Sequence, residues 1–271
     1  KKIIHFVSLF VALSSQAQLK KITLEEAVLQ QGRAFRADGL TGFQWIPNTN
    51  KYVFYTDAWT KIKSASTTND AAAELVSLAN INTAFGTKLK NFFGLQWIDA
   101  NTFMVTENGK YFTYNVNTKT GKQTIQAPET AENATFDSNK ANLAFTESNN
   151  LYFINSKGEK VTVTNETNKG IVSGQSIARN EFGISGGIFW SPKASYLAFY
   201  QKDETEVADY PLLDITETPG KLVNIKYPMI GQKSEKPRVG IYNVATGKTV
   251  FIAPKGNQDD YLTNLSWTPD E

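Results

Sequence analysis

Cysteine is absent from the sequence of 271 residues, and histidine occurs once, as His5. No disulfide can therefore stabilise the chain, although proteins outside the cytosol often depend on such bonds. Because His5 lies in a segment that we expect to be removed, the rest of the chain cannot form a Ser–His–Asp or Cys–His nucleophilic site, or a histidine-based zinc site. If the protein is a hydrolase of those types, its catalytic residues lie outside this sequence.

The amino-terminal apolar run is too short to cross a membrane. It extends from Ile3 to Leu13, about eleven residues, whereas a transmembrane helix needs roughly 20. Two lysines precede the run and SSQAQ follows it, which is typical of a secretory signal peptide cut after Ala17. We therefore expect residues 1–17 to be removed and the protein to be periplasmic or secreted.

An excess of charge of either sign is also absent once this segment is gone. The whole sequence has 28 basic and 26 acidic residues, and the two lysines of the signal peptide account for the difference. A neutral chain has no electrostatic attraction to nucleic acid, or to a membrane after signal cleavage, so neither is an expected partner. The hydrophobic content of 41% and the aromatic content of 12% indicate a packed protein rather than a disordered one.

Helix signals are few in this sequence. Thr23 and Glu26 form a capping box, which predicts a short helix from about Leu24 to about Gly32, the one convincing helix start in the chain. The segment 70–81 has helix-forming composition but fits a loop followed by a strand equally well. Elsewhere apolar and polar residues alternate between turn sequences such as ENGK, SKGEK and ATGK, which predicts many short antiparallel strands.

An internal repeat selects one all-β architecture among the sandwich, the barrel and the propeller. One half of the repeat is an apolar lead-in, an anchor aromatic, a turn and a second apolar strand. The anchors are Trp45, Trp97, Phe136, Trp190 and Trp267. The other half is an outer hairpin, found in KYFTYNVNTKTGKQTI, NLYFINSKGEKVTV and VGIYNVATGKTVFI. Together the halves make about four strands, which is one blade of a β-propeller, and we expect the anchors to pack between blades.

The repeat predicts an all-β fold, a partial β-propeller of about four blades plus the first strand of another. The expected organisation is a signal peptide over 1–17, an amino-terminal helical segment over 18–38 and an incomplete propeller domain over 39–271. Four blades and a fragment cannot close a ring of the usual size. We therefore expect the natural protein to continue beyond Glu271.

Two sets of residues match functional patterns without the context that those patterns need. Gly183, Ser185 and Gly187 fit GxSxG, but a nucleophile elbow requires a strand, a sharp turn, a helix and a later histidine. The IFWSP that follows reads as strand, so we expect Ser185 not to be catalytic and the neighbouring glycines to let a strand bend.

Glu204 and Glu206 could contact a ligand or partner but are better explained as residues of a solvated loop. No calcium-loop spacing occurs, and neither metal nor cofactor is expected.

Glu181 is the best candidate for a functional side chain. It follows the polar segment SGQSIARN and precedes Phe182, Gly183 and Ile184, so its carboxylate is expected at the edge of a buried strand. A carboxylate in that place can accept charge-assisted hydrogen bonds from an ammonium group. On these residues alone, an ion pair with Arg179 or an exposed turn charge is the simpler explanation.

The stretch RNEFGISGGIFWSPKASYLAFYQKDETEV, followed by YPMIGQ and VGIYNVATGKT, resembles the amino-terminal propeller of the dipeptidyl peptidase IV family of prolyl-specific serine peptidases. The resemblance is greatest to secreted bacterial members and covers about residues 20–271. It implies a two-part enzyme in which an eight-bladed propeller caps an α/β-hydrolase domain that lies beyond Glu271. That domain would supply Ser, Asp and His and would cleave peptide substrates after a penultimate proline or alanine.

The resemblance also implies a role for Glu181. In the family, an acidic motif just before the WSP strand binds the free amino group of the substrate, and Glu181 occupies that place, with Asn180 and Arg179 beside it as weaker candidates. Mammalian members have adjacent glutamates there, so the single carboxylate leaves a tripeptidyl enzyme of the same architecture as an alternative. A noncatalytic propeller that binds protein or glycan is a second alternative. Family members are often dimers, which makes a homodimer an expected assembly.

Overall fold

The structure is a computed structural model that describes residues 21–30, 32, 39–92, 94–252, 254–256, 260 and 262–271. It divides into two compact units, Lys1–Leu40 and Thr41–Glu271. The expected signal peptide, residues 1–17, lies outside the described residues and stays a prediction, as do the expected domain boundaries. No helix in the described part of the chain is long and apolar enough to cross a membrane.

The smaller unit contains the helix that the capping box predicts, α1 (Leu24–Val28). The Thr23 hydroxyl accepts a hydrogen bond from the Glu26 backbone N–H at 3.1 Å, and the Glu26 carboxylate accepts one from the Thr23 N–H at 3.1 Å. These two bonds satisfy donors that a helix start leaves unpaired, which explains why the helix begins here. The helix ends at Val28, earlier than the expected end near Gly32.

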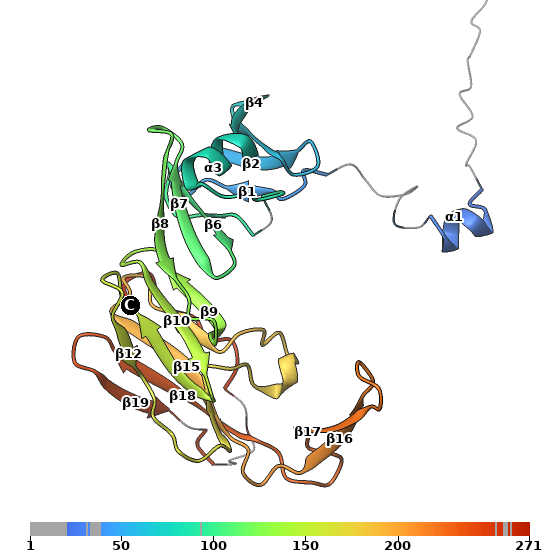
Figure 1. The fold of residues 1–271 in the computed structure, drawn as a ribbon, viewed down its shortest axis with the longest axis vertical. Helices are drawn as coiled ribbons and strands as arrows, with labels where there is room; N and C mark the ends of the chain where they lie inside the picture. The colour runs from blue at the N-terminus through green and yellow to red at the C-terminus, as the bar shows by residue number, and fades with distance from the viewer. Residues whose placement is uncertain are drawn as a thin grey trace, which may run out of the picture. The chain divides into compact units, whose positions relative to one another are not determined.

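Four antiparallel sheets make up most of the larger unit (Figure 1). The first sheet contains β1 (Gln44–Trp45), β2 (Lys51–Thr56), β3 (Lys61–Ser66) and β4 (Asn69–Ser77). The second contains β5 (Gln96–Trp97), β6 (Thr102–Glu107), β7 (Lys110–Asn115) and β8 (Thr120–Gln126). The third contains β9 (Glu132–Asp137), β10 (Asn142–Glu147), β11 (Asn150–Ile154) and β12 (Lys160–Thr162). The fourth contains β13 (Ile171–Ser173), β14 (Ile188–Trp190), β15 (Tyr196–Asp203), β18 (Lys236–Asn243) and β19 (Lys248–Ile252).

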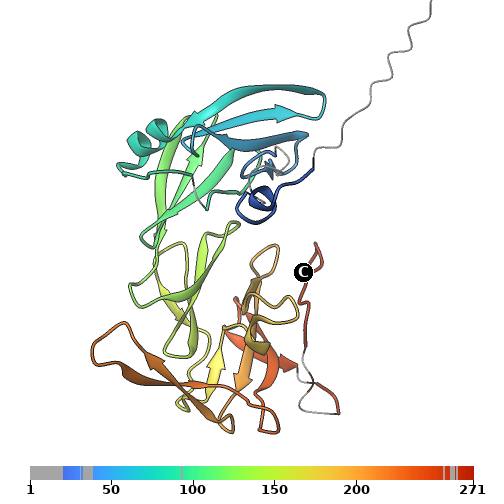
Figure 2. The ribbon, with the colours of Figure 1, turned by 90° about the vertical axis from the view of Figure 1, so that its right-hand side faces the viewer.

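Consecutive sheets share hydrophobic clusters, and Figure 2 shows the sheets following one another along the chain. Because successive side chains of a strand point to opposite faces, the neighbours Phe103 and Met104 on β6 belong to different clusters. Phe103 packs with Val53 and Ile62 of the first sheet, whereas Met104 packs with Phe145 of the third. This stacking of four-stranded sheets confirms the expected partial β-propeller.

Four of the anchor aromatics lie on the first strand of their sheets, as the repeat predicts, namely Trp45, Trp97, Phe136 and Trp190, whereas Trp267 lies in a segment without a described strand. The Trp190 indole N–H donates to the Thr135 carbonyl of the preceding sheet at 3.1 Å, and Trp267 donates in the same way to Phe189 at 3.1 Å. In both cases the acceptor is the backbone carbonyl of the residue that directly precedes the previous anchor in the chain, Phe136 or Trp190. Trp45 differs because 53% of its surface is exposed, so the expectation that it packs between sheets is wrong for this anchor.

The ambiguous segment 70–81 forms both a strand and a helix start. β4 continues to Ser77, and α3 (Leu78–Phe85) begins directly after it. The Ser77 hydroxyl accepts a hydrogen bond from the Asn80 N–H, and the Asn80 side chain accepts one from the Ser77 N–H. The prediction of one convincing helix start was therefore wrong, because an asparagine completes this capping box in place of Glu or Gln.

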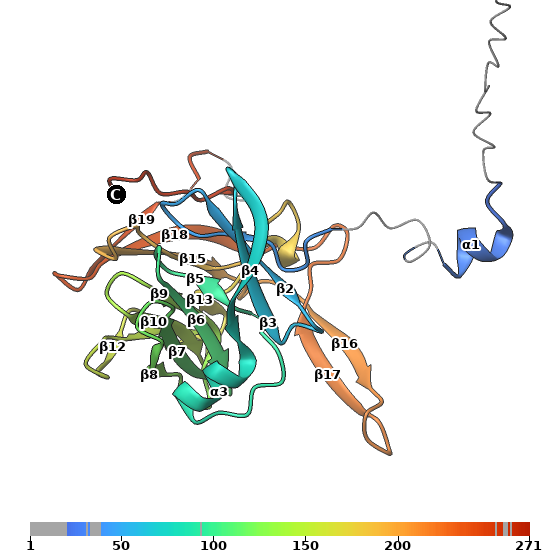
Figure 3. The ribbon, with the colours of Figure 1, turned by 90° about the horizontal axis from the view of Figure 1, so that it is seen from above.

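The fourth sheet departs from the simple blade in two places. Its first strand is split into β13 and β14, and both parts pair with β15. A separate hairpin of β16 (Asp209–Asp214) and β17 (Lys221–Lys226) lies between β15 and β18 in the chain. Figures 1 and 3 show this hairpin projecting from the sheet. Its exposed apolar side chains include Leu213 and Leu222, at 66% and 70% exposure.

Gly240 gives a test of the packing in the fourth sheet. It pairs with Phe199 across β15 and β18, and a Cβ at position 240 would lie 2.3 Å from the fully buried Phe199 ring. We predict that Gly240→Ala lowers the free energy of unfolding by about 1–3 kcal/mol, the usual cost of overpacking. Urea denaturation of the full-length protein measures this. Gly39→Ala is the control, because a Cβ there meets no atom within 4 Å, and equal stabilities of the two variants would contradict the prediction.

Candidate functional site

The split in the first strand of the fourth sheet produces a loop, residues 175–186, which we call the site loop. Both of its ends bond to one residue of β15, since the Gly174 N–H donates to the Tyr200 carbonyl at 2.8 Å and the Tyr200 N–H donates to the Gly187 carbonyl at 3.0 Å. A Cβ on Gly187 would lie 2.3 Å from the Gln175 backbone. Glycine is therefore needed where the two ends of the loop approach each other.

Apolar side chains fix the site loop to one face of the fourth sheet. Ile177 and Ile184 are 0% and 5% exposed and pack in a cluster with Tyr200 and Val239. Burial of a large aliphatic side chain contributes roughly 1.5–3 kcal/mol. The loop is thus an ordered part of the sheet surface, and the polar residues between the two isoleucines are held in place.

A left-handed turn lies between these two isoleucines. Ala178, Arg179 and Asn180 have φ angles of 50°, 50° and 63° and form the short helix η1 (Ala178–Asn180), which is the gold coil in Figure 1. Phe182 follows with a φ of 55°. A left-handed conformation costs about 1–2 kcal/mol for each non-glycine residue. Strain of this kind concentrates at binding and catalytic sites, where the surrounding contacts enforce it.

Glu181 directly follows this turn, and its own backbone is extended. Its side chain is exposed and borders a cavity of about 220 Å³, together with Phe182 and Tyr227. No other described residue forms a hydrogen bond or ion pair with the Glu181 carboxylate, although the Glu181 N–H donates to the Ala178 carbonyl at 2.9 Å. The carboxylate is therefore available to a ligand in the cavity.

Arg179 borders the same cavity but does not pair with Glu181. Its Nη1 donates to the Lys226 carbonyl at 2.9 Å, and the guanidinium lies 4.7 Å from the centre of the Tyr227 ring. A cation over an aromatic face is attracted by the ring quadrupole. The structure thus excludes the simpler explanation of Glu181 as an ion pair with Arg179.

Asn180 and Ser185 lie at a different cavity, of about 380 Å³, which Asn133 and Ser176 also line. Asn180 is thus on another side of the turn from the Glu181 cavity. Ser185 is exposed, and the chain continues into β14 rather than into a helix. The helix that a nucleophile elbow requires does not follow Ser185, and its lack of a catalytic role stays a prediction.

The structure adds Lys202, Glu235 and Tyr227 to the Glu181 cavity, none of which the sequence singled out as a site residue. It also corrects the expectation for Glu204, whose side chain is only 16% exposed and lines this cavity instead of lying in a solvated loop. The Lys202 Nζ lies 3.2 Å from the carboxylates of both glutamates. Tyr227 comes from the YPMIGQ segment, which had served only as a family marker. Glu206 instead pairs with Lys236, and that hydrogen bond lowers the pKa of Glu206.

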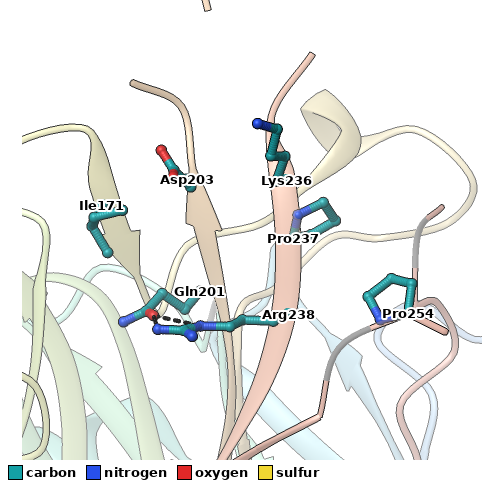
Figure 4. A pocket seen from close by; sticks show the side chains of 7 residues that line it. All are labelled: Ile171, Gln201, Asp203, Lys236, Pro237, Arg238 and Pro254. Carbon is teal, nitrogen blue, oxygen red and sulfur yellow. Dashed lines mark hydrogen bonds between the residues drawn. The ribbon is translucent and has the colours of Figure 1, made fainter. Parts of the chain in front are cut away.

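A further cavity of about 320 Å³ lies on the fourth sheet (Figure 4). Arg238 reaches across it, and its Nε donates to the Gln201 side chain at 2.8 Å. The guanidinium also lies 3.9 Å from the centre of the Phe251 ring. A side-chain hydrogen bond from Thr205 lowers the pKa of Asp203 at the cavity edge. These charged groups already have protein partners, so this cavity is a weaker candidate than the one at Glu181.

Among the described residues, no group of three or more His, Cys, Asp or Glu side chains is placed to hold a metal ion.

The sequence model of one protein family, the dipeptidyl peptidase IV N-terminal region, matches residues 101–271, which include the third and fourth sheets and the site loop. The chain belongs to this family.

Similar proteins agree with the family assignment. Dipeptidyl aminopeptidase B of Saccharomyces cerevisiae is 25% identical over 171 residues, which cover 59% of this chain and 20% of that protein. A solved structure from Bacteroides ovatus, assigned as a dipeptidyl aminopeptidase IV, is 35% identical with a TM-score of 0.73 and covers 86% of this chain and 32% of that one. Porphyromonas gingivalis dipeptidyl peptidase 4 shares the fold, with a TM-score of 0.66 at 20% identity over 92% of this chain and 37% of that one. The chain thus spans about a fifth of the yeast relative and about a third of each solved structure.

The two glycines before β14 allow a matched test of the site loop. A Cβ at position 187 would meet the Gln175 backbone at 2.3 Å, whereas a Cβ at position 186 meets no atom within 4 Å. We predict that Gly187→Ala separates the two ends of the loop and speeds hydrogen exchange at the Tyr200 N–H, because its acceptor is the Gly187 carbonyl. Exchange measured by mass spectrometry should change for Gly187→Ala and not for Gly186→Ala. The same exchange rate in both variants would contradict this account of the loop.

Proposed function

We propose that this chain is the propeller portion of a secreted prolyl dipeptidyl peptidase, and that Glu181 binds the free amino terminus of the substrate. The propeller admits short peptides and excludes folded proteins. Hydrolysis after a penultimate proline or alanine would be carried out by a serine α/β-hydrolase domain outside this sequence. The main support is the position of Glu181, an exposed carboxylate without a partner among the described residues, beside a cavity and directly after a strained turn.

The charges around the cavity favour an ammonium ligand. The Arg179 and Lys226 side chains donate hydrogen bonds to backbone carbonyls, and the Lys226 Nζ also lies 3.1 Å from the Asp209 Oδ1. Lys202 is shared between two carboxylates. Each nearby cation thus has its own partners, whereas the Glu181 carboxylate has none among the described residues. A protonated amino terminus would supply the missing positive charge through charge-assisted hydrogen bonds.

The register of cleavage depends on how the substrate amino terminus is held. Asn180 lies at the other cavity, so the residue in place of the second glutamate of mammalian members is not beside the Glu181 cavity. A tripeptidyl peptidase of the same architecture therefore remains the alternative. The expected homodimer stays a prediction, and so does secretion. A noncatalytic binding propeller is the remaining alternative, and it would cleave no peptide reporter.

We predict that Glu181→Gln weakens transition-state stabilisation by on the order of 2–4 kcal/mol in the full-length enzyme, because the ammonium group loses its charged partner. The measurement is kcat/KM with reporters that have a free amino terminus and proline as the second residue. Parallel reporters with proline as the third residue distinguish the tripeptidyl alternative.

Glu206→Gln is the matched control for this substitution. Glu206 is an exposed carboxylate in the turn after β15 that pairs with Lys236 and does not line the cavity. Its loss should change kcat/KM by less than about twofold, as expected for an exposed ion pair. If Glu181→Gln cleaves the reporters as fast as this control, Glu181 is only an exposed turn charge and the proposed function is wrong.

A further inference from the structure

A buried carboxylate holds the turn that carries Glu181. Glu235 lies directly before β18 and is 7% exposed. Its Oε1 accepts a hydrogen bond from the Ala178 backbone N–H at 2.6 Å, and its Oε2 lies 3.2 Å from the Lys202 Nζ. Both carboxylate oxygens therefore have partners, one of them in the site loop and the other on β15.

We infer that Glu235 is a positioning residue for amino-terminus recognition and acts through Glu181. This inference rests on the proposed function. Ala178 is the first residue of the left-handed turn, and its carbonyl accepts the Glu181 N–H at 2.9 Å. A hydrogen bond to Ala178 therefore fixes the peptide group one turn before the binding carboxylate. A strained turn persists only where surrounding contacts enforce it, and a charged acceptor gives the stronger kind of hydrogen bond.

Lys202 is the counter-ion that offsets the cost of burying the Glu235 carboxylate. A buried carboxylate without a counter-ion would be strongly destabilising, and Lys202 provides one while also contacting Glu204. Two carboxylates and one ammonium leave the cluster with one net negative charge beside the cavity. Arg179 and Lys226 line the same cavity and balance this charge together with that of Glu181, so the cluster supports recognition through the position of Glu181 and not through net charge.

The test is a double-mutant cycle in the full-length enzyme. The single variants are Glu235→Ala and Glu181→Gln, and the double variant combines them. The measurement is kcat/KM with a reporter that has a free amino terminus and proline in second place. We expect Glu235→Ala to lower kcat/KM about 10- to 100-fold, as for loss of a hydrogen bond to a charged group. In the Glu181→Gln background the same change should cost less than about threefold, because the residue through which Glu235 acts has already been disabled.

Two further variants separate positioning from general stability. Glu235→Gln retains a carbonyl acceptor for the Ala178 N–H, so we expect its kcat/KM to be close to that of the unsubstituted enzyme. This variant also tests the inference if Glu235→Ala does not fold. Glu147→Ala is the matched control, since it removes a carboxylate that pairs with Lys160 in the third sheet. Its kcat/KM should stay within about twofold of the unsubstituted enzyme.

The outcomes are distinguishable. Equal losses from Glu235→Ala in both backgrounds would mean that Glu235 acts independently of Glu181 and would overturn the inference. Unchanged activity of both Glu235 variants would also overturn it while leaving the proposed function intact. An unchanged Glu181→Gln single variant would instead overturn the proposed function, and this inference with it.

Discussion

The candidate site depends on the backbone pairing of Tyr200. Its carbonyl and its N–H close the two ends of the site loop, at Gly174 and Gly187, so the first strand of the fourth sheet continues on either side of the loop. The sheet keeps its hydrogen bonds, and the chain gains a segment that is free to adopt another conformation. Without this closure, the two short strands would have no common register on β15.

Strain and its compensation explain the conformation of the site loop. Three consecutive left-handed residues are unfavourable, and no glycine relieves them. The buried isoleucines on either side, the Glu235 carboxylate and the Arg179 contacts to Lys226 and Tyr227 enforce the turn. The turn ends at Glu181, whose carboxylate has no protein partner in the described part of the chain. Favourable contacts in the fourth sheet thus offset the strain of the turn. They hold the exposed Glu181 carboxylate in a position where a ligand can reach it.

The architecture could be predicted because its signals are local. Anchor aromatics and outer hairpins recur along the chain, and strand pairs such as β7 with β8 need only adjacent segments and a turn. Predictions failed where a local signal had an uncommon form or where a distant contact was needed. Asn80 completed a capping box in place of an acidic residue, and Trp45 stayed exposed although its repeat matched the others.

The sequence by itself determined the repeat, the sheets that the repeat forms and the position of Glu181 beside the WSP strand. Only the tertiary structure decided what surrounds that carboxylate. Ala178 and Glu235 are 57 residues apart in the chain, and no periodic pattern links them. Arg179 is next but one to Glu181, yet it turns to Lys226 because the left-handed turn directs it there. Secondary structure follows from local pattern, whereas the partners of a side chain depend on which distant strands the fold brings together.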